Sequence, residues 1–381
     1  MRTIAVITTS RADYGIYRSL LRRLAAGGDA ELKLIVGGMH LRPEYGGTLK
    51  EIEDDGFTID ATVDLLGDGD SGLDVAAAMG RGIAGFAEAL SRLKPDIAVV
   101  LGDRFEMFAA AAAAGPLGIP LAHIHGGELS RGSIDDAFRH AITKLSHIHF
   151  AACEQYARRI RQMGEEDWRV HVSGAPGLDN PDEIVPLAGA GLEALIGMAL
   201  SPPPLLVSCH PAALGDGEGE IAALLDALDK SARPIVVTAP NADAGGRALA
   251  ARLKHFAAGC DRASYVESLG TRGYLGMMAA AAAMVGNSSS GIIEASSFAL
   301  PVVNIGMRQD GRLRPANVID APMANDIAPA LDRALSGDFR DGLSGLENPF
   351  RASRPAADII YEVLATVPLD AKLISKKFRD I

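Results

Sequence analysis

The chain has few cysteines and no long hydrophobic run. Cys153, Cys209 and Cys260 are its three cysteines, and no two of them form a Cys-x-x-Cys pair. This spacing argues against a disulfide framework and against a zinc site. No stretch approaches the length of a membrane span, and charge at Arg11 and Asp13 interrupts the start before a signal-peptide core can form. We therefore expect a protein of the reducing cytoplasm.

Positive charge is also scarce. The 381 residues include 37 Lys and Arg against 48 Asp and Glu, which gives a formal net charge of −11. Nucleic acids and membranes are therefore not expected partners, and any anionic ligand must be held by local groups. With 48% hydrophobic residues, the chain is long enough to build two domains, each with its own core.

Strand-like and helix-like segments alternate along the whole chain, beginning with a predicted strand at residues 3–9 and a predicted helix at 14–26. The alternation stops in a proline-rich stretch at 174–204 and then restarts. Regular alternation is typical of parallel sheets covered by helices on both faces. The sequence predicts an α/β fold of two Rossmann-like, doubly wound domains that face each other across a cleft.

The expected boundaries follow from this break. We predict an N-terminal domain at 1–178, a linker at 179–203 and a C-terminal domain at 204–362. A tail helix at 363–381 can cross back to the first domain.

The strongest single motif is GNSSSGIIE at residues 286–294, which follows an apolar strand and opens a predicted helix at 292–298. Unpaired backbone N–H groups and the positive end of a helix dipole favour a phosphate there. Each serine alone is explained equally well as a helix cap, but three hydroxyls between two glycines favour a ligand. Glu294 is placed to accept hydrogen bonds from a ribose.

Acids and histidines cluster after two predicted strands of the first domain. Asp103 follows the strand at 96–101, and His125 and Glu128 follow the next strand. Because parallel strands end at the same edge of a sheet, these side chains are expected to converge. Asp135 opens a helix four residues before Arg139, so a cap and a helical ion pair are alternative explanations for these two.

Three further positions point to an anion. Arg11 follows the first strand, His210 ends the first strand of the second domain, and Arg312 lies in an arginine-rich loop. The loop at Arg11 is not a GxGxxG fingerprint, so no dinucleotide site is indicated. No metal or redox cofactor is expected either, since arginines, a histidine and a helix N-terminus can neutralise a diphosphate.

Long motifs spread over both halves carry a resemblance. They include SRADYG, LGDRFE, HIHGGE, DDAFRHAITKLSHIHF, CHP, PNADAGGR, GNSSSGIIEA and NIGMRQDGRLR. Together they resemble the hydrolysing UDP-N-acetylglucosamine 2-epimerases of sialic acid biosynthesis. The resemblance implies a fold of the glycosyltransferase B type, a nucleotide sugar in the interdomain cleft and a homodimer or homotetramer. It also implies conversion of UDP-N-acetylglucosamine to N-acetylmannosamine and UDP through a 2-acetamidoglucal.

Residue roles follow from the same resemblance. Asp103 and Asp135 match carboxylates implicated in proton transfer. Some members have glutamate where this chain has His125, which leaves the identity of the base and the acid open. Glu128 or His125 can take one of these roles. The resulting catalytic candidates are Asp103, Asp135, His125 and Glu128, and the substrate-binding candidates are Arg11, His210, Asn241, Ser288, Ser289, Ser290, Gly291, Glu294 and Arg312.

Four alternatives stay open on the sequence alone. The nearest keeps the reaction but acts on UDP-2,4-diacetamido-2,4,6-trideoxyglucose, a sugar of legionaminic acid biosynthesis. A non-hydrolysing epimerase and a glycosyltransferase share the fold, and fold does not fix function. A non-catalytic nucleotide-sugar sensor is the fourth.

Overall fold

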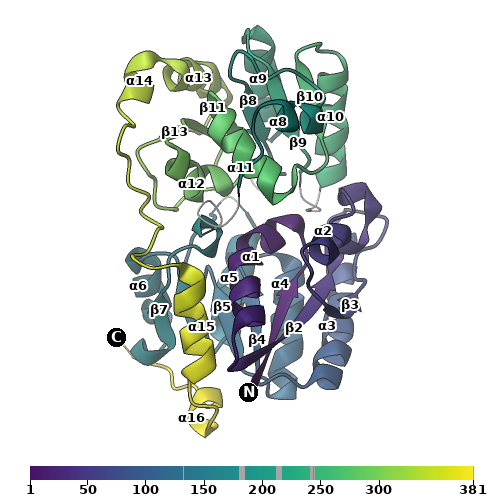
Figure 1. Cartoon of the computed structure of the whole chain (residues 1–381), viewed down its shortest axis with the longest axis vertical. Helices are drawn as coiled ribbons and strands as arrows, with labels where there is room; N and C mark the ends of the chain where they lie inside the picture. The colour runs from purple at the N-terminus through teal and green to yellow at the C-terminus, as the bar shows by residue number, and fades with distance from the viewer. Residues whose placement is uncertain (132, 180–184, 212–216, 241–242, 244, 381) are drawn as a thin grey trace. The chain divides into compact units, whose positions relative to one another are not determined.

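The computed structural model describes residues 1–131, 133–179, 185–211, 217–240, 243 and 245–380. Its internal contacts divide the chain into two compact units, whose helices and strands are drawn in Figure 1. Unit 1 comprises Met1–Glu128, Asp135–Glu183 and Phe350–Ile381, and unit 2 comprises Leu129–Ile134 and Ile184–Pro349. Within the described ranges, no helix is both long and apolar enough to span a bilayer.

Unit 1 is built on a seven-stranded parallel sheet with the strand order β3-β2-β1-β4-β5-β6-β7. The central strand β4 has the sequence IAVVL and is buried at every position, because helices cover both faces of the sheet. The strand order reverses between β1 and β4, and ligands of such sheets bind outside the carboxyl ends of the strands at this point. The strands are β1 (Arg2–Thr8), β2 (Ala30–Gly37), β3 (Ile59–Val63), β4 (Ile97–Leu101), β5 (Leu121–Ile124), β6 (Ile148–Ala151) and β7 (Val170–Val172).

The helices of unit 1 bury apolar stripes against this sheet. In α1, the N-cap Ser10 accepts the N–H of Asp13 at 3.3 Å, and leucines at positions 20, 21 and 24 face the core. The helices are α1 (Arg11–Ala26), α2 (Leu49–Asp54), α3 (Gly72–Leu93), α4 (Phe105–Ala114), α5 (Asp135–Leu145), α6 (Glu154–Gln162), α15 (Ala356–Thr366) and α16 (Ala371–Ile374).

The helix α15 belongs to unit 1, although it comes from the end of the chain. In Figure 1 it lies beside α1, and Arg23 of α1 donates to Asp358 of α15 at 2.9 Å. Asp179 accepts the N–H groups of Ala356 and Ala357 at 3.0 and 2.8 Å, which caps the helix. These contacts differ from the sequence-based ranges, which assigned Asp179 to a linker and residues 350–362 to the C-terminal domain.

Unit 2 repeats the architecture with six parallel strands in the order β10-β9-β8-β11-β12-β13. Its strands are β8 (Leu205–Ser208), β9 (Ile235–Thr238), β10 (Ala263–Val266), β11 (Ala283–Gly286), β12 (Val302–Ile305) and β13 (Val318–Ala321). Its helices are α8 (Gly189–Ile196), α9 (Gly217–Lys230), α10 (Gly246–Ala258), α11 (Gly270–Ala280), α12 (Ser290–Ile293), α13 (Ile327–Leu335) and α14 (Gly337–Asp341). The prediction of two doubly wound α/β sheets is confirmed.

Candidate active site

A tight turn at the end of β5 carries two of the candidate residues. His125 leaves the strand with φ 63°, in the left-handed region, and its N–H donates to the carbonyl of Phe150 at 3.0 Å. At Gly127, which has φ 75°, a Cβ atom would lie 2.4 Å from the carbonyl oxygen of Tyr156. Only glycine fits there, and the resulting turn brings Glu128 back to the His125 ring.

Four side chains meet at this turn. His125 Nδ1 lies 2.6 Å from Glu128 Oε1, and Arg139 Nη1 donates to the His125 carbonyl at 2.8 Å. Arg139 Nη2 donates to Asp103 Oδ2, and Nη1 lies 3.7 Å from Glu128 Oε2. The structure therefore brings Asp103, His125 and Glu128 together around one guanidinium.

Burial sets the character of this cluster. The side chains of Arg139 and Glu128 are 1% exposed and that of His125 is 5% exposed, whereas Asp103 keeps 20%. Charged groups buried this far from water are stable only when they are paired and hydrogen-bonded. The planar guanidinium group of arginine can bind two carboxylates at once. The arrangement can hold a proton-transfer group in a fixed position at the carboxyl end of the sheet.

Arg139 is the member that the sequence did not single out. A helical ion pair with Asp135 explained it there, and the structure places its guanidinium against Asp103, Glu128 and the His125 carbonyl. Its position three and four residues before the buried Ile142 and Thr143 was the available signal, since it lies on the inward face of α5.

The other two candidates of unit 1 begin helices. Asp135 is the first residue of α5, one turn before Arg139, and Arg11 is the first residue of α1, directly after the Ser10 cap. Both are partly exposed. Their helices start at the carboxyl ends of the strands, where an acid and a cation can reach a ligand.

His123 has a structural role. It is fully buried, with Nε2 2.8 Å from the Gly102 carbonyl oxygen and Nδ1 3.2 Å from Thr143 Oγ1. Burial lowers the pKa of His123 to about 3, so the ring stays neutral at pH 7. It fixes the turn at Gly102 that leads into Asp103.

In unit 2, the turn after β11 is fastened to the end of β8. A Cβ atom at Gly286, which has φ 142°, would lie 2.1 Å from the Ser208 carbonyl oxygen. Asn287 Oδ1 accepts the N–H of His210 at 2.7 Å, and its Nδ2 donates to the His210 carbonyl at 2.9 Å. His210 is 8% exposed. The turn thus holds His210 beside the three serines.

The serine hydroxyls are partly engaged. Ser290 Oγ lies 2.5 Å from Tyr274 Oη and 3.0 Å from Ser288 Oγ, and all three serines are partly exposed. Gly291 is buried in the following helix, and Glu294, partly exposed, ends it. Hydroxyls in this setting can exchange a protein partner for a ligand oxygen.

The predicted continuous helix at 292–298 is wrong. The helix α12 covers only Ser290–Ile293, and a 3₁₀ turn follows at Ala295–Phe298. Ala299 ends this turn in the left-handed region with φ 48°. Four helical residues sum to a small macrodipole, so hydroxyls and backbone N–H groups are left as the main anion donors of the turn.

Arg312 lies in the loop after β12 and is 9% exposed. Its Nη2 donates to Ser130 Oγ at 3.3 Å, within unit 2. The neighbouring Arg308 lies 3.7 Å from Asp243 and donates to the Asn287 carbonyl at 3.3 Å. This positive loop therefore reaches the turn after β11. Asn241, also a candidate, lies outside the described residues.

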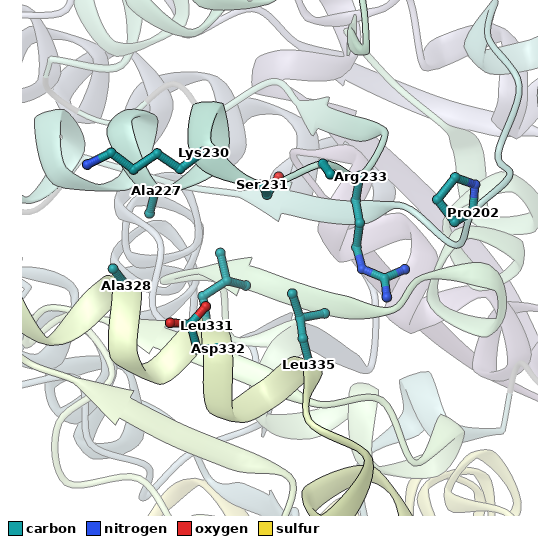
Figure 2. A pocket seen from close by; sticks show the side chains of 10 residues that line it. Pro202, Ala227, Lys230, Ser231, Arg233, Ala328, Leu331, Asp332 and Leu335 are labelled. Atoms are coloured by element: carbon teal, nitrogen blue, oxygen red, sulfur yellow. The ribbon is translucent and has the colours of Figure 1, made fainter.

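A pocket of about 480 Å³ in unit 2 is unrelated to these residues (Figure 2). It is lined by Pro202 and Arg233, which precede β8 and β9, and by Leu331 and Asp332 of α13. It therefore lies at the amino ends of the strands, whereas all the candidate residues of unit 2 follow carboxyl ends. Among the residues that the structure describes, no three His, Cys, Asp or Glu side chains are grouped as a metal site.

Comparison with solved structures places the fold. The crystal structure of UDP-GlcNAc 2-epimerase from Neisseria meningitidis bound to UDP-GlcNAc matches with a TM-score of 0.79 at 17% identity, covering 96% of this chain and 99% of that chain. At this identity the likeness establishes the fold, a pair of Rossmann-like units of the glycosyltransferase B type.

The sequence places the family. The model of the UDP-N-acetylglucosamine 2-epimerase family matches residues 22–365, and the chain belongs to this family. A Campylobacter jejuni protein named GDP/UDP-N,N'-diacetylbacillosamine 2-epimerase (hydrolyzing) is 36% identical over 100% of this chain and 99% of its own length. A Legionella pneumophila protein named UDP-N,N'-diacetylbacillosamine 2-epimerase (hydrolyzing) is 35% identical over 99% of both chains.

Proposed function

We propose that the protein is a hydrolysing 2-epimerase of a UDP-linked 2-acetamido sugar, and that this sugar is 2,4-diacetamido-2,4,6-trideoxyglucose. Two relatives that align over essentially the whole chain carry the name of this activity and of this sugar, N,N'-diacetylbacillosamine. The observation that carries the proposal is the buried cluster of Asp103, His125, Glu128 and Arg139, which has the acids, base and fixed geometry that proton transfer at carbon requires.

The proposed reaction needs two groups of residues, one that transfers protons and one that stabilises the leaving diphosphate. In the first step a base takes the C2 proton, the C2–H electron pair forms the C1=C2 bond, and UDP leaves with the electron pair of the C1–O bond. Water then adds to C1 and a proton to C2 on the opposite face, which inverts C2. The C2 proton is not acidified by a carbonyl, so the leaving diphosphate must be strongly stabilised. We assign this task to Arg11, His210, Arg312 and the serine turn.

UDP-N-acetylglucosamine is the second candidate substrate. It was the first choice from the sequence, and it is the substrate in the name of the family. The two sugars differ at C4, which bears an acetamido group or a hydroxyl, and at C6, which lacks or bears a hydroxyl.

Proton NMR in deuterated water tests the proposal when the two UDP-sugars are offered separately. We expect free UDP and a manno-configured sugar with deuterium at C2, formed faster from the diacetamido substrate. A UDP-linked manno product would instead identify a non-hydrolysing epimerase. Binding of both sugars without turnover would favour the sensor or the glycosyltransferase, and Asp103→Ala should then leave the behaviour unchanged.

A further inference from the structure

We propose that His125 is the base that removes the C2 proton and that Glu128 is the residue that positions it. This inference rests on the proposed epimerase function and assigns the step that the HIHGGE motif left open. Its basis is the geometry of one turn, in which a histidine and a carboxylate three residues apart form a buried dyad.

The contact to Glu128 selects the tautomer of His125. Arg139 Nη1 lies 3.7 Å from Glu128 Oε2, and this cation favours the ionised carboxylate. An ionised carboxylate only accepts hydrogen bonds, so at 2.6 Å Nδ1 of His125 must be the donor. In the neutral ring the lone pair is then on Nε2, the nitrogen on the far side from Glu128.

The backbone keeps this ring in place. His125 is held with φ 63° by its bond to the Phe150 carbonyl and by the Arg139 contact to its own carbonyl. A residue other than glycine in this region is strained, and such strain persists only where the surroundings enforce it. A pre-positioned base avoids the cost of ordering during the reaction.

The hydrogen bonds in the cluster favour His125 over Asp103 as the base. Asp103 Oδ2 already accepts a hydrogen bond from Arg139. Among the described residues, none is hydrogen-bonded to His125 Nε2. The charged and titratable groups around the ring are Glu128 in the same turn, Arg139 of α5 with its partner Asp103, and His123 of β5.

The chemical step balances with this assignment. Nε2 takes the proton from C2 and the ring becomes an imidazolium, whose charge Glu128 compensates. The C2–H pair becomes the C1=C2 bond and UDP departs with the C1–O pair. In the second step water gives hydroxide to C1 and its remaining proton to the carboxylate of Asp103 or Asp135. That aspartate passes the proton to C2 on the face opposite His125, and the imidazolium returns its own proton to solvent. Imidazole is a stronger base than a free carboxylate, which suits a C–H bond without a neighbouring carbonyl.

Three variants test the assignment by turnover. His125→Gln, which keeps a polar side chain but has no base, should lower kcat at least 100-fold while UDP affinity stays within about threefold. His125→Glu, the residue of other family members, should recover activity and move the acidic limb of the rate profile to lower pH, since a carboxylate stays a base there. Glu128→Gln should lower kcat at least tenfold with KM unchanged. His255→Gln, on an exposed position of α10, is the matched control.

A nitrogen-15 NMR measurement of the histidine tautomers makes the test independent of turnover. We expect His125 to carry its proton on Nδ1 in the wild type and to lose this preference in Glu128→Gln. If the wild type converts neither UDP-sugar, the proposed function fails, and the tautomer still decides whether the dyad exists. A proton on Nε2 in the wild type, or wild-type turnover in His125→Gln, would overturn the inference.

Discussion

The loops at the carboxyl ends of the two sheets carry different kinds of polar groups. In unit 1, ionisable side chains from the turns after β4 and β5 pack around the buried Arg139 of α5. In unit 2, the turn after β11 consists of hydroxyls, amide contacts and backbone N–H groups, partly open to solvent. The six strands of unit 2 follow the same order as the first six strands of unit 1, so the difference comes from the loops and not from the topology.

In the proposed function, this difference separates two tasks. A buried ionic cluster is rigid and costly to disturb, which suits a group that must transfer a proton in one geometry. A half-exposed turn of hydroxyls can exchange one partner for another at a small cost, which suits reversible recognition of a nucleotide. Mutations in unit 1 are therefore expected to affect stability and turnover together, and mutations in unit 2 mainly affinity.

The largest expected effect is that of Arg139→Met. Removing this cation leaves the buried Glu128 and the half-buried Asp103 without their shared partner, and should lower the free energy of unfolding by about 3–5 kcal/mol. Trp168, the single tryptophan, lies in unit 1 and reports its unfolding in denaturant by fluorescence. Arg161→Met, which removes partly exposed ion pairs to Glu154 and Asp167, is the control and should cost less than about 1 kcal/mol. Equal losses in the two variants would contradict the special role of the cluster.

Next in size is Gly127→Ala in the turn between His125 and Glu128. The added Cβ meets the Tyr156 carbonyl at 2.4 Å in addition to an unfavourable φ, so more than about 2 kcal/mol should be lost. Gly118→Ala separates the two causes, since Gly118 has φ 66° and open space around its Cβ position. It should cost only about 1–2 kcal/mol. Chemical denaturation of both variants, followed at Trp168, makes the comparison.

Acid should weaken unit 1 through its buried histidines. His40 bonds the hydroxyls of Thr8 and Thr48 at 2.9 and 2.7 Å, and burial lowers its pKa to about 3. In the unfolded chain His40 takes up a proton near pH 6.5, whereas in the folded chain it stays neutral down to about pH 3. The contribution of His40 to the free energy of unfolding is therefore fully present above pH 6.5 and is lost as the pH falls toward 3. The expected contribution is up to about 1.4 kcal/mol per pH unit.

His40→Gln measures this contribution. The variant should show a shallower fall of the unfolding free energy between pH 6.5 and 4.5 than the wild type, as followed at Trp168. His255→Gln, on the surface of unit 2, should leave the slope unchanged. A wild-type slope in His40→Gln would show that another group dominates the acid sensitivity.

The smallest effects are expected in unit 2. Ser290→Ala and Glu294→Ala should each weaken UDP binding about five- to tenfold, because each removes about one net hydrogen bond of about 1 kcal/mol to the nucleotide. Isothermal titration calorimetry measures this, with the exposed Ser344→Ala as control. Unchanged affinity for UDP in both variants would show that the nucleotide does not bind at this turn.

Most of the fold could be read from the sequence, because alternating buried strands and amphipathic helices leave a strong periodic signal. The weak elements were the ones missed. The edge strand β13, Val318–Ala321, has only four residues with mixed burial, and the sequence pattern does not predict a strand there. The helix at 292–298 was overestimated, since its periodicity does not reveal the break after Ile293.

The candidate cluster was predictable in part. Asp103, His125 and Glu128 could be placed at one edge because parallel strands end together. Arg139 could not, since its partner Asp103 is 36 residues away and a nearer carboxylate offered a local explanation.

The sequence by itself determined the family, the two doubly wound sheets and the loops that carry the candidate residues, because motifs and periodicity are local properties of the chain. The tertiary structure decided which charges meet. It paired Arg139 with Asp103 and His125 with Glu128, and it joined α15 to unit 1 through Asp179. Such pairings depend on burial and on residues distant in the chain, and only the packed fold brings these together.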